Sequence, residues 1–291
     1  MSGSEKSRNR ILIADDDEAI RDFVTAVLQG DGELEITVCA TGTEVEAQLK
    51  SKSFDVVLLD VWFGDRNGLE LLAENKADLA TSRVIMMTAD STSQTLLRAI
   101  RENAFQYIRK PFSPDELREK VEAALAATAP DRIEVISALS DWVEVLVPCS
   151  RVAAARIQDF IMQVKMDLKP ELREIVSYVF HELLLNAIEW GGKLDPTRKV
   201  RIAFLHTPRM VLYRIQDPGS GFSFDNIPHA AVSNEPDDPL RHSRVREEAG
   251  MRPGGLGLMM VKSMADELLY NEAHNEVVFV KYLDRTPEST S

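Results

Sequence analysis

The sequence predicts two consecutive domains of different fold class: an α/β domain with a doubly wound parallel sheet, followed by an α+β two-layer sandwich. Three observations support this prediction. The chain has 291 residues, about twice the length of a typical single domain. Its first part alternates short apolar runs with helical patterns. From about Asp131 the helical patterns come first and most strand patterns follow them.

Residues 10–127 contain five successive units, each made of an apolar run and a helical pattern. Continuous apolar runs are typical of parallel strands that are buried on both faces. The units are ILIA with EAIRDFVTAVLQG, EITVCA with TEVEAQLKS, DVVLLDV with GLELLAENKA, RVIMMTA with QTLLRAIREN, and FQYIRKPF with PDELREKVEAALAAT. A ligand site in such a sheet is expected at the carboxyl ends of the strands.

The second part opens with WVEVLVP, which alternates like a half-exposed strand. Two helices are then expected, SRVAAARIQDFIMQVKMDL and PELREIVSYVFHELLLNAIEWGG, the second begun by proline and stopped by two glycines. Strands RKVRIAFLHT and MVLYRIQDPGSGF, a helix LGLMMVKSMADELLY and a last strand EVVFVKYL complete the pattern. We expect domains over 1–127 and 141–284, a short, partly helical linker over 128–140 and a frayed tail over 285–291.

Composition argues against several classes of function. The chain carries 34 basic and 47 acidic residues, a net charge of −13, and its basic stretches RHSRVREE and PTRKVRI are short and interrupted, so direct DNA binding is not expected. No apolar run approaches the roughly 18 residues of a membrane span, and MSGSEKSRNR lacks the apolar stretch of a signal peptide, so we expect a cytoplasmic protein without a membrane segment. Cys39 and Cys149 are far apart in sequence and are expected to be reduced thiols.

Acidic residues follow two of the expected parallel strands. Asp15 and Asp16 end the first strand and Asp60 ends the third, so three carboxylates meet at one sheet edge. They repel each other unless a cation neutralises them, and oxygen ligands favour Mg²⁺. Thr88 and Lys110 end the fourth and fifth strands and add a hydroxyl and an ammonium group, which suit a phosphoryl group.

At these residues the sequence resembles the receiver domains of two-component response regulators, across residues 8–127. Thr88 follows Asp60 by 28 residues, Lys110 follows it by 50 and Gly68 by 8, and the run KPF also fits the family. One departure is Gly64, which stands where the family usually has proline and could loosen its loop.

The resemblance implies a flavodoxin-like (βα)₅ fold in which Asp60 takes a phosphoryl group from an upstream histidine kinase or phosphotransfer protein. It also implies roles for the other residues: Mg²⁺ held by Asp15, Asp16 and Asp60, the acyl phosphate secured by Thr88 and Lys110, and a two-position switch formed by Thr88 and Tyr107.

A second group of motifs lies in the second domain. Glu182 and Asn186 are four residues apart on one helix face, where an amide oxygen can bind Mg²⁺ and a carboxylate can accept a proton. The loop DPGSG and the helix start PGGLG would let backbone approach a ligand and offer an anion site. Their candidate residues are Asp217, Gly219, Gly221, Gly254, Gly255 and Gly257.

In this order the three motifs resemble the N, G1 and G2 boxes of the GHKL ATPase superfamily, with its Bergerat ATP-binding fold. The fit covers residues 142–283 and is closest to the anti-sigma-factor serine kinases. It implies ATP and Mg²⁺ as cofactors, Glu182 as general base, Asn186 as Mg²⁺ ligand and Asp217 as the reader of the adenine amino group. The glycines named above and Leu258 would contact the nucleotide, around a lid over 222–253. Trp190 stands where that family commonly has histidine.

His181 allows a second interpretation, because His-Glu also begins the phosphoacceptor site of a histidine kinase. About fifty residues between Thr128 and His181 are too few for a dimerising hairpin and the start of an ATPase domain. We therefore expect His181 to have a packing or supporting role.

Together the two sites predict a response regulator whose phosphorylation on Asp60 controls an ATP-binding output domain. The first hypothesis is a protein serine/threonine kinase of the anti-sigma type, acting on a STAS-type anti-sigma antagonist. Two alternatives remain: a module that uses ATP to sequester a sigma factor or its antagonist without phosphotransfer, and an ATPase that phosphorylates a histidine of a partner. The resemblance also implies a homodimer.

Overall fold

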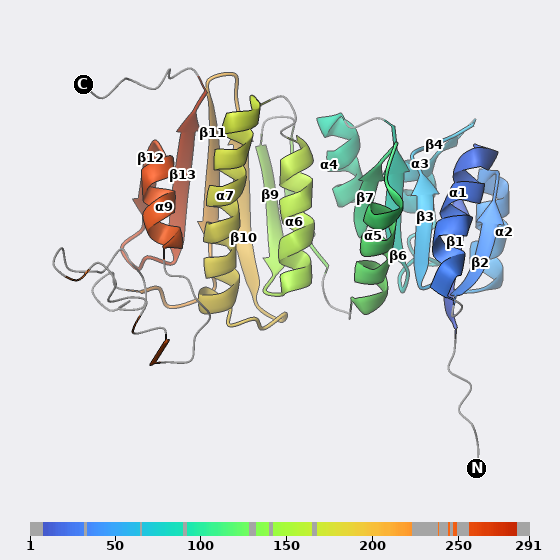
Figure 1. Cartoon of the computed structure of the whole chain (residues 1–291), viewed down its shortest axis with the longest axis horizontal. Helices are drawn as coiled ribbons and strands as arrows, with labels where there is room; N and C mark the ends of the chain where they lie inside the picture. The colour runs from blue at the N-terminus through green and yellow to red at the C-terminus, as the bar shows by residue number, and fades with distance from the viewer. Residues whose placement is uncertain are drawn as a thin grey trace, which may run out of the picture. The chain divides into compact units, whose positions relative to one another are not determined.

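The computed structural model describes residues 8–31, 34–64, 66–89, 92–127, 132–139, 142–164, 168–222 and 256–283, and residues 238, 244, 247 and 248. The chain divides into two compact units, Met1–Ala129 and Pro130–Ser291 (Figure 1). In the part of the chain that is described, no helix combines the length and apolar character needed to cross a lipid bilayer. Cys39 and Cys149 are free cysteines with buried side chains.

The first unit is built on a five-stranded parallel sheet in the order β2-β1-β3-β6-β7. The strands are β1 (Asn9–Ala14), β2 (Leu34–Cys39), β3 (Val56–Asp60), β6 (Arg83–Thr88) and β7 (Gln106–Arg109). Every residue of β3 is buried, as the continuous apolar run predicts. Because β1 lies between β2 and β3, right-handed crossovers place helices on both faces of the sheet. The predicted doubly wound α/β fold is confirmed.

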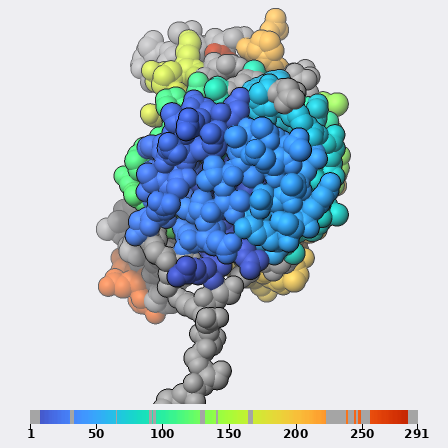
Figure 2. All heavy atoms as spheres, turned by 90° about the vertical axis from the view of Figure 1, so that its right-hand side faces the viewer, coloured from blue at the N-terminus to red at the C-terminus, as the bar shows by residue number. Residues whose placement is uncertain are grey.

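Five helices connect and follow these strands: α1 (Glu18–Leu28), α2 (Gly42–Ser51), α3 (Gly68–Glu74), α4 (Ser93–Arg101) and α5 (Pro114–Ala126). Each is preceded by a side chain that accepts a hydrogen bond from a backbone N–H in its first turn, which stabilises the helix start. These capping residues are Asp17, Thr41, Asn67, Thr92 and Ser113. Figure 2 shows the face of this unit formed by the first elements of the chain, coloured blue to cyan.

A short 3₁₀ turn, η1 (Gln29–Asp31), follows α1, and a small hairpin separates β3 from α3. Its strands β4 (Trp62–Phe63) and β5 (Arg66–Asn67) pair antiparallel. The side chain of Phe63 is buried, whereas that of Trp62 is 58% exposed. The hairpin therefore has one apolar anchor in the core and one aromatic side chain at the surface.

The second unit is a six-stranded antiparallel sheet in the order β12-β13-β11-β10-β9-β8. The strands are β8 (Glu134–Ala138), β9 (Trp142–Pro148), β10 (Lys199–His206), β11 (Met210–Gln216), β12 (Glu267–Tyr270) and β13 (Glu276–Tyr282). Helices α6 (Arg151–Val164), α7 (Pro170–Asn186) and α9 (Gly257–Met264) lie together on one face of the sheet (Figure 1). The predicted α+β two-layer sandwich is confirmed.

An aromatic cluster forms the core between the sheet and its helices. Tyr213 of β11 lies with its ring centroid 5.1 Å from that of Phe180 of α7 and 5.8 Å from that of Phe279 of β13. Phe204 of β10 contacts both Tyr213 and Phe160 of α6. Along β11 buried residues alternate strictly with less buried ones, which is the pattern of a sheet with one covered face, whereas β10 and β13 also contain consecutive buried residues.

Two expectations about this unit are wrong. Residues 134–138 lie in the range expected to be a partly helical linker, but they form β8 at the sheet edge, with an irregularity between Val135 and Ser137. The last helix was expected to run through ADELLY, but it ends at Met264, and β12 pairs with β13. Both strands are short and carry little periodicity of their own, and their pairing with a neighbouring strand outweighs the local helix propensity.

Candidate functional sites

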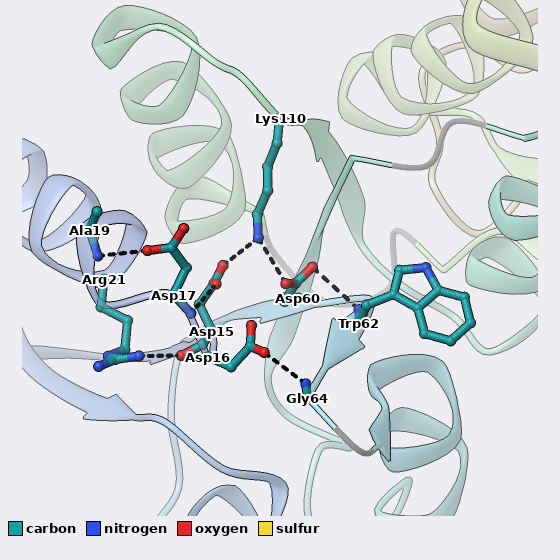
Figure 3. A network of polar contacts seen from close by, with 9 residues as sticks. All are labelled: Asp15, Asp16, Asp17, Ala19, Arg21, Asp60, Trp62, Gly64 and Lys110. Carbon is teal, nitrogen blue, oxygen red and sulfur yellow. Dashed lines mark hydrogen bonds and ion pairs between the residues drawn. The ribbon is translucent and has the colours of Figure 1, made fainter.

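The first candidate site lies at the carboxyl edge of the parallel sheet. Asp15 follows β1 and Asp60 is the last residue of β3, and the strand register brings both to the same edge. Single carboxylate oxygens of Asp15, Asp16 and Asp60 all lie within 4.8 Å of one another (Figure 3). Asp15 and Asp60 are buried and Asp16 is exposed. The predicted cluster of oxygen ligands is therefore assembled, and its donor atoms suit a hard cation such as Mg²⁺.

Lys110, which follows β7, provides positive charge within this cluster. Its Nζ lies 2.6 Å from Oδ2 of Asp15 and 2.8 Å from Oδ2 of Asp60 (Figure 3). Burial by itself lowers the pKa of Lys110, but contacts with both aspartates outweigh it and raise the pKa above its usual value. The pKa of Asp60 is also raised, because burial outweighs the hydrogen bond from Lys110. An ionised Asp60 is thus disfavoured unless positive charge compensates it.

Thr88 and Tyr107 lie on the two neighbouring strands. Thr88 is the last residue of β6, and its backbone oxygen accepts a hydrogen bond from the backbone N–H of Lys110 at 2.7 Å. Both Thr88 and Tyr107 are buried, and Tyr107 pairs with Met86 in the interior of β7. The structure thus places Thr88 beside Lys110 at the sheet edge and Tyr107 within the adjacent strand.

The β4–β5 hairpin closes another side of this site. The backbone N–H of Gly64 donates to Oδ2 of Asp16 at 2.9 Å, and that of Trp62 donates to Oδ1 of Asp60 at 3.4 Å (Figure 3). Gly64 has a φ of +51°, which favours glycine. A Cβ atom at Gly68 would lie 1.9 Å from the backbone oxygen of Asp60, so the glycine eight residues after Asp60 is required by close backbone approach.

The second candidate site is a cavity of about 820 Å³ in the second unit. It is lined by α7 and the turn after it, by the end of β11 and the loop beyond, by the start of α9 and by the β12–β13 turn. The predicted residues that line it are Glu182, Asn186, Asp217, Gly219, Gly221, Gly257 and Leu258. Gly254, Gly255 and nearly all of the expected lid over 222–253 lie outside the described residues.

Asp217 is held in a fixed position at this cavity. Its backbone N–H donates to the oxygen of Asn275, and its Oδ1 accepts a hydrogen bond from the backbone N–H of Gly219 at 2.7 Å. Burial raises the pKa of Asp217, an effect that the Gly219 N–H and the nearby Arg198 guanidinium reduce. An oriented, buried carboxylate of this kind can accept a hydrogen bond from an amino group of a ligand.

Glu182 lies where α7 meets α9. A Cβ atom at Gly257, the first residue of α9, would lie 2.0 Å from Oε2 of Glu182, so no larger residue fits there without displacing the carboxylate. Asn186 is one helical turn further along the same face and lines the same cavity. The arrangement brings a carboxylate, an amide and a helix N-terminus to one cavity wall, where an anionic ligand can bind.

Sequence reasoning missed Gly191 and Gly192 as site residues and interpreted them only as a helix stop. After Asn186 the chain forms a π-helix, Ala187–Gly191, and a Cβ atom at Gly191 would lie 2.2 Å from Oδ1 of Asp217. A Cβ atom at Gly192 would lie 2.2 Å from the Cys149 sulfur. The pair GG was the available signal, but its reason is close packing of Gly191 against Asp217 and of Gly192 against Cys149.

An aromatic group at the cavity was also missed. The rings of Phe222, Tyr270 and His274 contact one another with centroids 5.5 to 6.1 Å apart. Gly221, with a φ of +83°, lets the chain pass the backbone oxygen of Ala273. No sequence signal joins these residues, because Phe222 and Tyr270 are far apart along the chain.

His181 lines the cavity beside Glu182, and its Nδ1 lies 2.6 Å from Oε1 of Gln158 on α6. This contact between two helices supports the expected packing or supporting role.

Comparisons with known proteins match both parts of the chain. Residues 11–122 match the family model of the response regulator receiver domain, and residues 148–281 match that of the histidine kinase-like ATPase domain. The DNA-binding response regulator MtrA of Mycolicibacterium paratuberculosis is 29% identical over 211 residues, 72% of this chain and 91% of that protein. The alginate biosynthesis transcriptional regulatory protein AlgB of Pseudomonas aeruginosa is 33% identical over 118 residues, 40% of this chain and 26% of that protein.

Among solved structures, a CheY-like response regulator receiver domain protein from Methanospirillum hungatei is 33% identical, with a TM-score of 0.39. The match covers 41% of this chain and 94% of that one.

The two family matches coincide with the two sites. The first contains the carboxylate cluster with Lys110, and the second contains the cavity with Asn186 and Asp217. The chain is therefore a response regulator in which a receiver domain is joined to a histidine kinase-like ATPase domain, an ATP-binding output domain.

Proposed function

We propose that Asp60 accepts a phosphoryl group from a phosphohistidine of an upstream histidine kinase or phosphotransfer protein. A carboxylate oxygen of Asp60 attacks phosphorus, and the bond from phosphorus to the donor nitrogen breaks. Mg²⁺, held by Asp15, Asp16 and Asp60, would neutralise the phosphoryl oxygens. The contact of Lys110 with both buried aspartates supports this role, because the same ammonium group can hold the acyl phosphate.

We further propose that the output domain is a protein serine/threonine kinase of the anti-sigma type. ATP would occupy the cavity, with Asp217 accepting a hydrogen bond from the adenine amino group and Asn186 binding the Mg²⁺ of the triphosphate. Glu182 would take the proton from an attacking serine or threonine hydroxyl of a STAS-type anti-sigma antagonist. The observation that carries this proposal is the presence of Glu182 and Asn186 one turn apart on α7, at a cavity that also exposes Asp217.

One observation favours a second candidate. Trp190 is 52% exposed at the cavity, and an exposed tryptophan is a frequent contact in protein interfaces. The output domain could thus bind ATP and sequester a sigma factor or its antagonist without transferring phosphate. The DNA binding in the name of MtrA belongs to that protein.

The test is incubation of the full chain with γ-labelled ATP, Mg²⁺ and a lysate of the source cell, followed by acid treatment of the labelled protein. Acid-stable label that is lost in Glu182→Ala would support a hydroxyl-directed kinase. Acid-labile label that appears on a lysate protein with Asp60→Asn as well as with wild type, and is lost in Glu182→Ala, would indicate transfer to histidine and contradict the first proposal. Absence of label, with nucleotide-dependent capture of a partner that survives in Glu182→Ala, would favour sequestration. Asn186→Ala should impair the chain in every case, because it removes the Mg²⁺ ligand.

A further inference from the structure

The β4–β5 hairpin donates hydrogen bonds to two of the proposed metal-site aspartates, Asp16 and Asp60, and its Arg66 contacts helices α2 and α3. We propose that Arg66 is a positioning residue for the receiver's Mg²⁺ site: it fixes this hairpin so that the Gly64 N–H holds Asp16 in the orientation that binds the metal. This inference rests on the proposed Mg²⁺ site and adds a residue that touches neither the metal nor the phosphoryl group.

Arg66 joins the hairpin to helices on either side of it. Its Nη1 lies 2.6 Å from Oε1 of Glu46 on α2, and its Nη2 lies 2.6 Å from Oε2 of Glu74 at the end of α3. The two nitrogens of one planar guanidinium group therefore bind carboxylates of two different helices, which fixes the direction of the group. The hydrogen bond with Glu46, followed by the charges of both glutamates, raises the pKa of Arg66.

The aliphatic part of Arg66 also has a defined place. A Cβ atom at Gly42, the first residue of α2, would lie 3.1 Å from Cδ of Arg66 and 3.8 Å from its Cβ. The arginine stem thus packs against the backbone of α2 where a side chain is absent. Together with buried Phe63, with which Arg66 pairs across the hairpin, this contact anchors strands β4 and β5 to the rest of the receiver.

The hairpin in turn orients the site. Asp16 is exposed, so packing does not fix its carboxylate; the Gly64 N–H holds one of its oxygens at 2.9 Å (Figure 3). Gly64, at a φ of +51°, stands between the paired residues Phe63 and Arg66. Loss of the Arg66 contacts would free the hairpin, and Asp16 would then lose its fixed orientation. Asp15 and Asp60 are buried in the sheet edge and held by Lys110, so they would keep their orientation even when the 3.4 Å contact of Asp60 with the Trp62 N–H is lost.

Removal of a group that orients a metal ligand typically weakens metal binding by about tenfold or more. For Arg66→Ala we expect the Mg²⁺ concentration at half-saturation to rise about tenfold. The rate of phosphorylation at saturating Mg²⁺ should stay unchanged, because no ligand is removed. A higher half-saturating Mg²⁺ concentration with an unchanged rate at saturating Mg²⁺ distinguishes a positioning role from a general loss of structure.

The experiment is a Mg²⁺ titration of the nucleotide-free full chain. The titration is monitored by the fluorescence of Trp62, which is the part of the tryptophan signal that is missing in Trp62→Phe. The variants are Arg66→Ala, the double variant Glu46→Gln with Glu74→Gln, and the triple variant that combines these three substitutions. The matched control is Arg118→Ala, which removes the exposed ion pair of Arg118 with Asp115 on α5. Arg66→Ala and the glutamine double variant should shift the titration equally, and the triple variant should shift it no further.

An Arg66→Ala titration that coincides with those of wild type and Arg118→Ala would overturn the inference. So would an Arg66→Ala chain that loses phosphorylation even at saturating Mg²⁺ and unfolds at a lower temperature than Arg118→Ala. A wild-type chain without any Mg²⁺ response would overturn the metal site itself, and this inference with it.

Discussion

The ammonium group of Lys110 lies 2.8 Å from Oδ2 of Asp60, and the same group lies 2.6 Å from Oδ2 of Asp15. One cation is thus shared by two carboxylates that are almost inaccessible to solvent. Two buried anions at one sheet edge are stable only while positive charge compensates them. Lys110 therefore contributes to the stability of the receiver as well as to its chemistry.

Replacing Lys110 by alanine should leave both carboxylates without their shared cation. We expect the free energy of unfolding of the receiver at pH 7 to fall by about 3 kcal/mol, the usual cost of removing one partner of a buried ion pair. Urea unfolding with and without Mg²⁺ measures this change, and Mg²⁺ should restore more stability to the variant than to wild type. Arg98→Ala, which breaks the exposed pair with Glu70, should cost less than about 1 kcal/mol. Equal losses in the two variants would contradict the prediction.

Asp60 should make the stability of the receiver depend on pH. Its pKa in the folded chain is raised by burial, above an unfolded value of about 3.9. Its contribution to stability is therefore fully present below pH 3.9 and is lost as the pH rises through the folded pKa. Asp60→Asn removes this loss, so its urea midpoint should exceed that of wild type at pH 7 and match it near pH 4. A midpoint difference that stays constant between these pH values would disprove the assignment.

Much of the first site could be predicted from sequence, because each of its residues ends an apolar run. Parallel strands with continuous apolar runs are recognisable, and their carboxyl ends must share one edge, which brings Asp60, Thr88 and Lys110 together. The β4–β5 hairpin could not be predicted, because its strands have only two residues each and no periodicity. The contacts of Arg66 with Glu46 and Glu74 depend on that hairpin.

The second site was predictable only where residues are close in sequence. Glu182 and Asn186 share a helix face by their spacing alone. The π-helix at Gly191 and the contact of Phe222 with Tyr270 depend on tertiary packing. The strand β12 was interpreted as helix because ADELLY suits a helix locally, and only its pairing with β13 decides otherwise.

Gly191 should be needed for tight nucleotide binding. An alanine Cβ at this position would lie 2.2 Å from Oδ1 of Asp217 and would displace the carboxylate proposed to bind adenine. We expect Gly191→Ala to weaken ATP binding at least about tenfold, a change of about 1.4 kcal/mol, measured by calorimetric titration of the full chain. The matched control is Gly30→Ala in the receiver, where a Cβ atom meets nothing within 4 Å. Unchanged ATP affinity in Gly191→Ala would show that ATP binding does not depend on the present position of the Asp217 carboxylate.

Phosphorylation of Asp60 should change the output domain through Thr88. Thr88 ends β6 next to Lys110, and its hydroxyl is the group that would move toward an acyl phosphate. We expect a small-molecule phosphodonor to alter the ATP affinity or turnover of the wild-type chain and to leave Asp60→Asn unaffected. Thr88→Val keeps the shape of the buried side chain and removes the hydroxyl, so it should still accept phosphate but show no change in the output domain. The measurements are the hydroxylamine-sensitive phosphoryl label on the receiver and the ATP affinity in the same samples. An Asp60→Asn chain that behaves like the phosphorylated wild type in affinity, turnover and partner binding would refute control by the receiver, because the output domain would then act independently of Asp60.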